Sequence, residues 1–211
     1  MDKYIQLDTF TRYTRVSRET IKSLINYEKI LVKANKNLNL IGKSTIDNIW
    51  VRHFLDSAQL IDFIDKNCKT LVDLGSGAGF PGVILALIVK DRKIPLKIKL
   101  IDKSPKKIKF LNDLTDQLNL KCEILNENIF DKTKILTGDV YVARAFKPIG
   151  KILELIHSNA KNWKKVFVFL GKNGKSELLQ ASKTWDIEYK ESISVTSGDS
   201  WVIEINKIKK K

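Results

Sequence analysis

The run LVDLGSGAGFPG, residues 71–82, constrains the fold more than any other part of the chain. Its apolar start predicts a short buried strand that runs into a glycine-rich loop. The apolar stretch from Val83 to Val89 then has the length of a short helix. Glycine adopts positive φ and lets a ligand approach the backbone, and a helix N-terminus offers unpaired N–H groups. A strand, a glycine-rich turn and a helix in this order predict a nucleotide-binding site.

Candidate strands and helices alternate from residue 71 onward. The candidate strands are 71–74, 98–101, 122–125, 140–143, 166–170, 187–195 and 201–205. The candidate helices are 82–90, 105–118, 148–160 and 175–182. Such alternation predicts an α/β, Rossmann-like fold with a mostly parallel seven-stranded sheet and helices on both faces. The last two strands are separated only by a turn at 196–199, so we expect an antiparallel hairpin at one edge.

The pattern of apolar residues predicts an N-terminal helical cap at 1–66 and a Rossmann-like domain at 67–211. We expect the two to form one compact unit. Ser17 is a good N-cap for a helix that ends near residue 36, and apolar spacing predicts a second helix at 45–65. The N-terminus carries charges early and has no apolar segment typical of a secretory signal. No apolar run approaches the ~20 residues of a membrane span. We therefore expect a cytoplasmic protein without a membrane partner.

The glycine pattern narrows the ligand. Residues 77–82 fit GxGxxG, a weak signal that dinucleotide-binding dehydrogenases share. An acidic residue just before the glycines, here Asp73, is typical of S-adenosylmethionine sites. Pro81 has no N–H to offer a pyrophosphate, which matters less for a ligand without phosphate. Asp102 ends the second strand, where a carboxylate can accept hydrogen bonds from both ribose hydroxyls. Because a dehydrogenase places an acid there too, an NAD(P)-dependent oxidoreductase remains an alternative.

Further candidate residues lie at strand ends and on the second predicted helix. Residues 126–130 follow the third strand, where they could hold an adenine, and Arg144 ends the fourth strand at the ligand-binding edge. On the helix, Arg52 and Asp56 are four residues apart, beside His53. These three side chains form either a surface ion pair beside a packed histidine, or a frame for a base or its phosphate.

The charge predicts a polyanionic partner. The chain has 38 Lys and Arg against 24 Asp and Glu, a formal net charge of +14. Basic residues are dense at 90–109 and 207–211, which predicts a basic face for nucleic acid. The plainer explanation of the many lysines is the nucleotide composition of the genome, which can favour Lys codons without selection for binding. A non-catalytic RNA-binding module is a third possible function.

Taken together, these segments resemble the RsmG (GidB) family of bacterial 16S rRNA guanine-N7 methyltransferases. The resemblance covers about residues 20–205. The segments that carry it, in chain order, are 39–41, 51–57, 75–82, 102–104, 107–111, 144–146 and 170–172. Two positions depart from the family pattern: Ile41 stands where the family has Thr, and residues 127–129 replace an Arg-Ala-Glu-like segment.

The resemblance implies a class I methyltransferase fold, S-adenosylmethionine as cofactor, and 16S rRNA or a small-subunit particle as substrate, with the enzyme acting as a monomer. It implies that the cofactor contacts Gly75, Phe80, Asn128, Ile129 and Arg144, and the loop pattern adds Asp73, Gly77 and Asp102. We expect catalytic roles for Arg144, His53 and Asp56, and RNA contacts at Arg52, Lys106, Lys107 and Lys172. No metal is expected. Guanine N7 carries a lone pair and no proton, so its methylation needs positioning and no general base.

Overall fold

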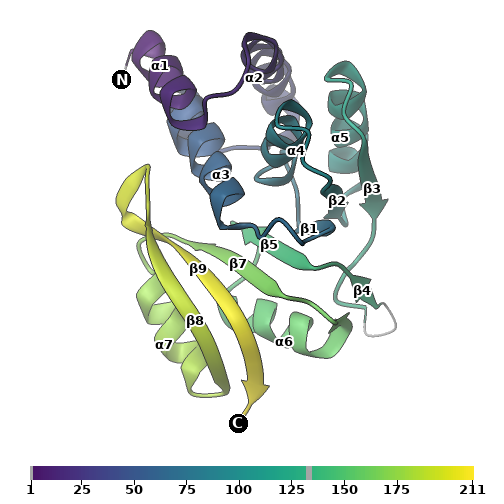
Figure 1. Cartoon of the computed structure of the whole chain (residues 1–211), viewed down its shortest axis with the longest axis vertical. Coiled ribbons are helices and arrows are strands. Elements are labelled where there is room, and N and C mark those ends of the chain that lie inside the picture. Colours follow the sequence, from purple (N-terminus) through teal and green to yellow (C-terminus); the bar gives the residue numbers. More distant parts are fainter. Residues whose placement is uncertain (1, 132–134) are drawn as a thin grey trace.

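A seven-stranded sheet forms the centre of the molecule (Figure 1). The computed structural model describes residues 2–131 and 135–211. The strands lie in the order β3-β2-β1-β5-β7-β9-β8, parallel up to β7 and antiparallel at β9 and β8. Their bounds are Thr70–Leu74 (β1), Lys97–Asp102 (β2), Cys122–Asn126 (β3), Val140–Arg144 (β5), Lys165–Leu170 (β7), Trp185–Ser194 (β8) and Ser197–Lys210 (β9). This confirms the predicted α/β class, with the order reversing between β1 and β5.

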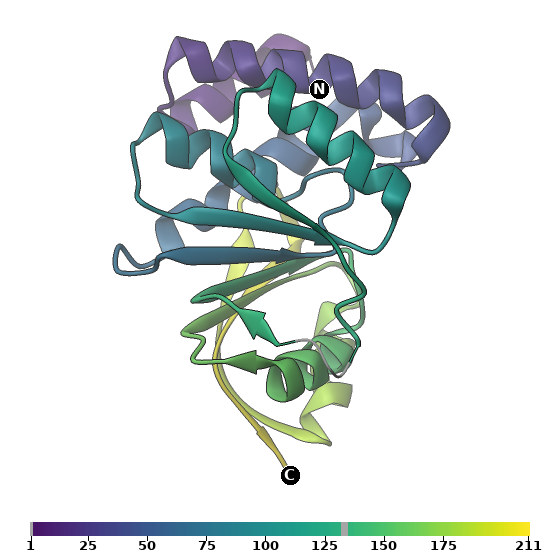
Figure 2. The same ribbon diagram turned by 90° about the vertical axis from the view of Figure 1, so that its right-hand side faces the viewer.

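Helices cover both faces of the sheet (Figure 2). One face carries α4 (Gly82–Asp91) and α5 (Pro105–Gln117), and the other carries α6 (Ile149–Asn159) and α7 (Gly174–Ser182). The helix α2 (Arg18–Leu38) packs outside α4 and α5, and its buried residues belong to the same apolar cluster as theirs. A second cluster fills the α6–α7 face. A contiguous apolar core therefore joins the N-terminal helices to the sheet.

The N-terminal segment contains a helix that the sequence did not predict. α1 (Lys3–Thr14) buries few side chains, chiefly Phe10, which meets Trp50 edge-on at 5.4 Å between ring centroids. So short an apolar stripe gives almost no periodic signal. For α2, the predicted N-cap is confirmed: the Ser17 side chain accepts a hydrogen bond from Thr20 N at 3.3 Å.

The segment predicted as a single helix at 45–65 is helical over residues 43–63, but it is not one regular α-helix. The chain instead passes through a 3₁₀ turn, η1 (Lys43–Asn48), a π-helical turn, η2 (Trp50–Leu55), a short α3 (Asp56–Ala58) and a second 3₁₀ turn, η3 (Gln59–Phe63). The Ser57 hydroxyl donates to the His53 carbonyl at 2.6 Å, so a side chain competes for a helical acceptor. Wide π turns are often found at functional sites. This one brings His53 and Asp56 together at the ligand-binding edge of the sheet.

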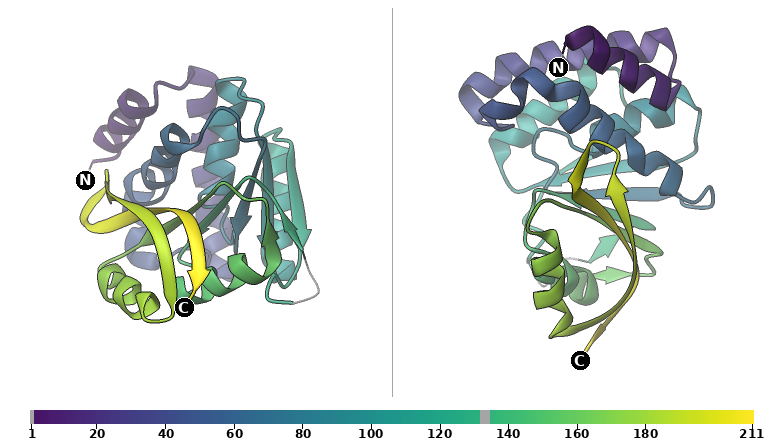
Figure 3. Two further views of the ribbon diagram at one scale, coloured as in Figure 1. Left: turned by 60° about the horizontal axis from the view of Figure 1, so that its bottom comes forward. Right: turned by 90° about the vertical axis from the view of Figure 1, so that its left-hand side faces the viewer.

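The edge hairpin is longer and tighter than expected. Its turn is at Val195 and Thr196, not at 196–199, and β9 extends to Lys210. Figure 3 (right) shows the hairpin tip beside the helical segment that contains α3. A separate two-stranded sheet of β4 (Leu136–Thr137) and β6 (Ala160–Lys161) was not predicted, because two-residue strands leave no pattern. No helix in the described part of the chain is long and apolar enough to cross a membrane.

Candidate active site

The glycine-rich loop leaves the carboxyl end of β1 and is fastened to β2. The backbone N–H groups of Gly75 and Ser76 both donate to the Ile101 carbonyl at 2.9 Å. Gly75, Gly77 and Gly79 have φ values of +74°, +56° and +98°, which residues other than glycine rarely adopt. The shape of the loop is therefore set by its backbone conformation, which requires glycine at these positions.

Asp73 supports this loop from behind. It is fully buried, and its Oδ2 accepts a hydrogen bond from Gly82 N at 2.9 Å. Burial raises the pKa of Asp73 to about 7. The expectation of an open helix N-terminus is therefore corrected: an internal carboxylate caps the start of α4. Asp73, which the loop pattern assigned to the ligand, lies behind the pocket wall and acts on the loop's shape.

A tyrosine from the N-terminal helices also holds the loop. The Tyr27 hydroxyl, on α2, donates to the Ala78 carbonyl at 2.6 Å. A Cβ at Gly79 would lie 2.7 Å from that hydroxyl oxygen and 2.6 Å from Val83 Cγ2, so only glycine fits. The sequence did not indicate this contact, because Tyr27 looks like one more apolar member of the helix stripe.

A cavity of about 440 Å³, here called the Gly75 pocket, opens at the carboxyl ends of β1, β2 and β3. Four of the predicted ligand residues line it: Gly75, Asp102, Asn128 and Ile129. The Asp102 carboxylate accepts from Gly77 N at 3.0 Å and from Ser104 N at 2.9 Å, and so fixes the loop against the end of β2. Lys107, which was predicted to contact RNA, instead lines this pocket.

Phe146 forms a wall of the Gly75 pocket that was not predicted by role. A Cβ at Gly75 would lie 2.1 Å from Phe146 Cδ2, so the ring packs directly on the glycine backbone. Phe130 stacks on Phe146 at 5.8 Å between centroids. The pocket lining thus combines two aromatic rings with the Asp102 carboxylate.

Arg144 sits at the end of β5 and is held by three groups from the segment 52–56. Its Nε pairs with Asp56 Oδ2 at 3.0 Å, its Nη1 donates to His53 Nδ1 at 3.2 Å, and its Nη2 donates to the Arg52 carbonyl at 2.5 Å. The ion pair considered between Arg52 and Asp56 is therefore replaced: Asp56 pairs with Arg144, and Arg52 contributes its backbone. Burial lowers the pKa of Arg144 and the Asp56 charge opposes that effect.

His53 is a neutral acceptor in this arrangement. Because Arg144 can only donate, His53 Nδ1 must accept, and Nε2 carries the proton toward Thr45 Oγ1 at 2.8 Å. Burial, with the charges of Arg144 and Arg52, lowers the pKa of His53 to about 3. The lone pair on Nδ1 is engaged, so the geometry gives His53 a positioning role and not that of a proton acceptor.

Asp56 is in turn held by one near neighbour, Gln59, and by two residues far away in sequence. Its Oδ1 accepts from Ser194 Oγ at 2.7 Å, Gln59 Nε2 at 2.9 Å and Thr196 Oγ1 at 3.1 Å. Ser194 and Thr196 lie at the hairpin tip, which explains the proximity visible in Figure 3. No local pattern in the sequence could find contacts that span about 140 residues.

Phe80 supports Arg144 from below. It is 6% exposed and stacks between His53 at 5.0 Å and Tyr27 at 5.6 Å. The Arg144 guanidinium lies 5.7 Å from the Phe80 centroid and 5.8 Å from that of Phe169. Phe80 lines neither the Gly75 pocket nor the neighbouring cavity described next. The ring is therefore packed against Arg144, His53 and Tyr27, and its contact with the cofactor stays a prediction.

A second cavity of about 240 Å³, here called the Arg144 pocket, meets the Gly75 pocket at Ala145. Its lining includes Asp56, Arg144, Phe169, Gly171, Thr196 and Trp201. Arg52 also lines this pocket, and exposed Lys172 follows Gly171. Exposed Lys106 lies in the first turn of α5.

The basic segments do not form the single face that was expected. Lys90, Lys93 and Lys97 line a cavity at the amino-terminal end of β2, whereas Lys103 and Lys107 line the Gly75 pocket beyond its carboxyl end. In the antiparallel hairpin, residues 207–210 pair with 185–188, at the end away from the tip. Only part of the charge therefore lies near the two pockets.

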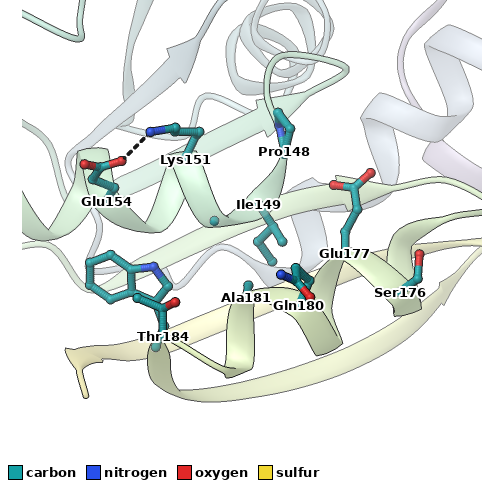
Figure 4. A pocket seen from close by; sticks show the side chains of 11 residues that line it. Pro148, Ile149, Lys151, Glu154, Ser176, Glu177, Gln180, Ala181 and Thr184 are labelled. Atoms are coloured by element: carbon teal, nitrogen blue, oxygen red, sulfur yellow. Dashed lines mark hydrogen bonds and ion pairs between the residues drawn. The ribbon is translucent and has the colours of Figure 1, made fainter.

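A further cavity of about 630 Å³ lies between α6 and α7 on the opposite face of the sheet (Figure 4). Its lining includes the Lys151–Glu154 ion pair at 2.9 Å and Trp185. None of the predicted site residues lines it. Within the described residues, no cluster of His, Cys, Asp and Glu could hold a metal ion.

Comparison with known proteins agrees with this geometry. The family model described as rRNA small subunit methyltransferase G matches residues 20–202. The ribosomal RNA small subunit methyltransferase G of Pelagibacter ubique (strain HTCC1062) is 40% identical over 198 residues, 93% of this chain and 92% of the relative. That of Rickettsia akari (strain Hartford) is 35% identical over 195 residues, 92% of this chain and 98% of the relative.

Solved structures share the fold. The 16S rRNA methylase RmtB has a TM-score of 0.55 at 14% identity, over 91% of this chain and 76% of its own. TrmK of M. capricolum, solved with S-adenosyl-homocysteine, has a TM-score of 0.53 at 19% identity, over 72% of this chain and 67% of its own. The predicted class I methyltransferase fold is confirmed. The chain belongs to the rRNA small subunit methyltransferase G family, as its sequence motifs indicated.

Proposed function

We propose that this protein transfers a methyl group from S-adenosylmethionine to N7 of one guanine in the 16S rRNA of the small ribosomal subunit. The observation that carries the proposal is that two unlike pockets are neighbours and share Ala145 in their linings. The lining of the Gly75 pocket combines the Gly75 backbone with the Asp102 carboxylate. The lining of the Arg144 pocket combines the Arg144 guanidinium with the aromatic rings of Phe169 and Trp201. Family membership supports a methyltransferase over an NAD(P)-dependent oxidoreductase or a non-catalytic RNA-binding module.

The residues of the Gly75 pocket fit the cofactor. Asp102 would hold the ribose hydroxyls, because a carboxylate offers about four acceptor sites and backbone N–H groups occupy only two of them. Buried Ile129 and exposed Asn128 would face the adenine. The glycine at 75 lets Phe146 pack against the loop and form part of the pocket lining. Lys107 offers a cation on the same wall, where it suits the cofactor's carboxylate.

S-adenosylmethionine supplies the methyl carbon from its sulfonium, and the C–S electron pair stays on sulfur while the N7 lone pair forms the new bond. No proton moves, so no residue has to act as a base. His53 meets this requirement because it is neutral and its Nδ1 is engaged by Arg144. The chain's own contribution is to orient Arg144 through Asp56 and His53 and to hold the two reactants in position.

We also propose that the enzyme acts as a monomer in the cytoplasm. The accepting RNA is either free 16S rRNA or a small-subunit particle.

Labelled S-adenosylmethionine and unmethylated small subunits test the proposal. We expect label on one guanine, and strand scission there by chemistry specific for 7-methylguanine. Label on another base or atom would contradict the assigned chemistry. A fluorescence change with NAD(P)H, without stabilisation by S-adenosylmethionine, would favour the oxidoreductase. RNA binding without cofactor affinity would favour the binding module.

A further inference from the structure

The Arg144 pocket is not explained by cofactor binding. Its walls come from four separate segments: the π turn and α3, the end of β5, the end of β7, and the edge hairpin. At about 240 Å³ it is smaller than the ~300–1,000 Å³ of pockets for drug-sized ligands, so it suits one planar ring system. It meets the Gly75 pocket at Ala145, whose φ of +49° turns the chain so that Arg144 and Phe146 serve different pockets.

The lining chemistry suits a nucleobase. Phe169 and Trp201 are half-buried aromatic residues in the lining; Arg144 lies over one face of Phe169 at 5.8 Å and Lys175 over one face of Trp201 at 5.1 Å, which leaves the second face of each ring. Ser200 offers a hydroxyl group. Arg144 has five N–H protons, of which three are engaged by Asp56, His53 and the Arg52 carbonyl in the described part of the chain. One N–H on each terminal nitrogen is left to donate to a base oxygen.

The electrostatics suit a purine that becomes cationic. Methylation at N7 leaves a positive charge on the guanine ring. The paired Asp56 carboxylate offsets the Arg144 charge at 3.0 Å, and aromatic faces attract a cationic ring. Exposed Arg52 and Lys172 beside the pocket could hold the flanking phosphates.

We propose that the Arg144 pocket holds the acceptor guanine, flipped out of the RNA, stacked on Trp201 and Phe169 and contacted by Arg144. The proposal rests on the function proposed above. Enzymes that modify a base commonly take it out of the stack and read it by stacking and edge hydrogen bonds. The edge hairpin is then part of the substrate site, locked to α3 by the bonds of Ser194 and Thr196 to Asp56.

Two independent variants test this role with the full chain. Trp201→Ala removes the stacking surface, and Trp201→Phe should restore most of the rate. Gly171→Leu adds a side chain at the pocket wall; a Cβ there meets nothing within 4 Å, so the fold should tolerate it. We expect Trp201→Ala and Gly171→Leu each to lower kcat/KM for small subunits about tenfold or more, since base stacking contributes ~1–3 kcal/mol per base.

Matched controls separate this role from general damage. Tyr189→Ala truncates another aromatic residue on the hairpin, and Gly198→Leu alters another open glycine; neither residue lines the Arg144 pocket. Both should keep the wild-type rate, and S-adenosylhomocysteine should bind every variant within twofold of wild type by calorimetry. If Trp201→Ala no longer binds S-adenosylhomocysteine, the kcat/KM of Gly171→Leu alone tests the pocket assignment.

Wild-type kcat/KM in Gly171→Leu and in a folded Trp201→Ala would overturn the pocket assignment while the proposed function stands. Failure of the wild-type protein to label guanine N7 would overturn both.

Discussion

The two pockets that meet at Ala145 are built in different ways. In the Gly75 pocket, carboxylates accept hydrogen bonds from backbone N–H groups: Asp102 from Gly77 and Ser104, and Asp73 from Gly82. In the Arg144 pocket, side chains hold one another: Asp56 receives bonds from Arg144 and from the hairpin tip. One side depends on local chain geometry, and the other on several distant segments meeting.

The two pockets should therefore respond to different kinds of substitution. The backbone conformation around the Gly75 pocket is disrupted when a side chain is added where none fits. A side-chain network fails when one member is removed, because its charged partner then remains buried without compensation. Substitutions in each pocket, each paired with a matched control, test that contrast.

Asp56→Ala should have the largest effect. The change leaves the Arg144 guanidinium, 16% exposed, without its ion pair, which typically costs about 3–5 kcal/mol when such a pair is buried. Urea unfolding measures the loss. The control is Lys151→Ala, which breaks an ion pair with side chains 64% and 57% exposed and should cost at most ~1 kcal/mol. Equal losses in the two variants would remove the proposed contrast.

Gly82→Ala should have the next largest effect, on the Gly75 side. A Cβ there would lie 2.3 Å from Leu100 Cδ2 and 2.6 Å from Asp73 Oδ2, and overpacking of this kind costs about 1–3 kcal/mol. Gly150→Ala is the matched control, because a Cβ at this helical glycine meets nothing within 4 Å. Thermal unfolding should show Gly82→Ala destabilised and Gly150→Ala unchanged or stabilised. Similar melting temperatures would argue against the tight fit.

His53 should make stability depend on pH. Its pKa falls from 6.5 to about 3 on folding, so its contribution is complete above pH 6.5 and is lost as pH falls toward 3. Between pH 7.5 and 5.5 this amounts to about 1.4 kcal/mol. His53→Asn keeps an acceptor for Arg144 but cannot titrate, so it should lose this component and retain methylation. A large loss of turnover in His53→Asn, with its fold intact, would restore histidine as a catalytic group.

Lys172→Ala should have the smallest effect. One phosphate contact fewer should weaken RNA binding a fewfold and lower the slope of log K against log salt by about 0.9 if the contact is to duplex RNA, or 0.7 if to a single strand. Binding measured at several salt concentrations gives both quantities. The wild-type slope itself should be steep. An unchanged slope in the variant would place Lys172 outside the RNA contact.

The same contrast explains what the sequence could predict. The alternation of strands and helices, the antiparallel edge hairpin, the glycine loop and the position of Asp102 at the end of β2 follow from short-range spacing, and all were expected. Tyr27, Gln59, Ser194 and Thr196 could not be expected, because their partners lie far away in sequence. The π turn was missed since apolar periodicity at 45–65 fits an ordinary helix, while Ser57 and the buried polar side chains reshape it. The hydrogen bond from Gly82 to Asp73 was not expected, as spacing alone does not distinguish a capping carboxylate from one that touches ligand, and the contact of Asp73 with the cofactor stays a prediction.

A structure with bound S-adenosylhomocysteine tests the central claim most directly. We expect the adenine against Asn128 and Ile129, the ribose hydroxyls on Asp102, and the sulfur facing Ala145 and the Arg144 pocket. An adenosyl group seated between Arg144 and Trp201, or any placement that leaves Asp102 without a ribose contact, would contradict the account.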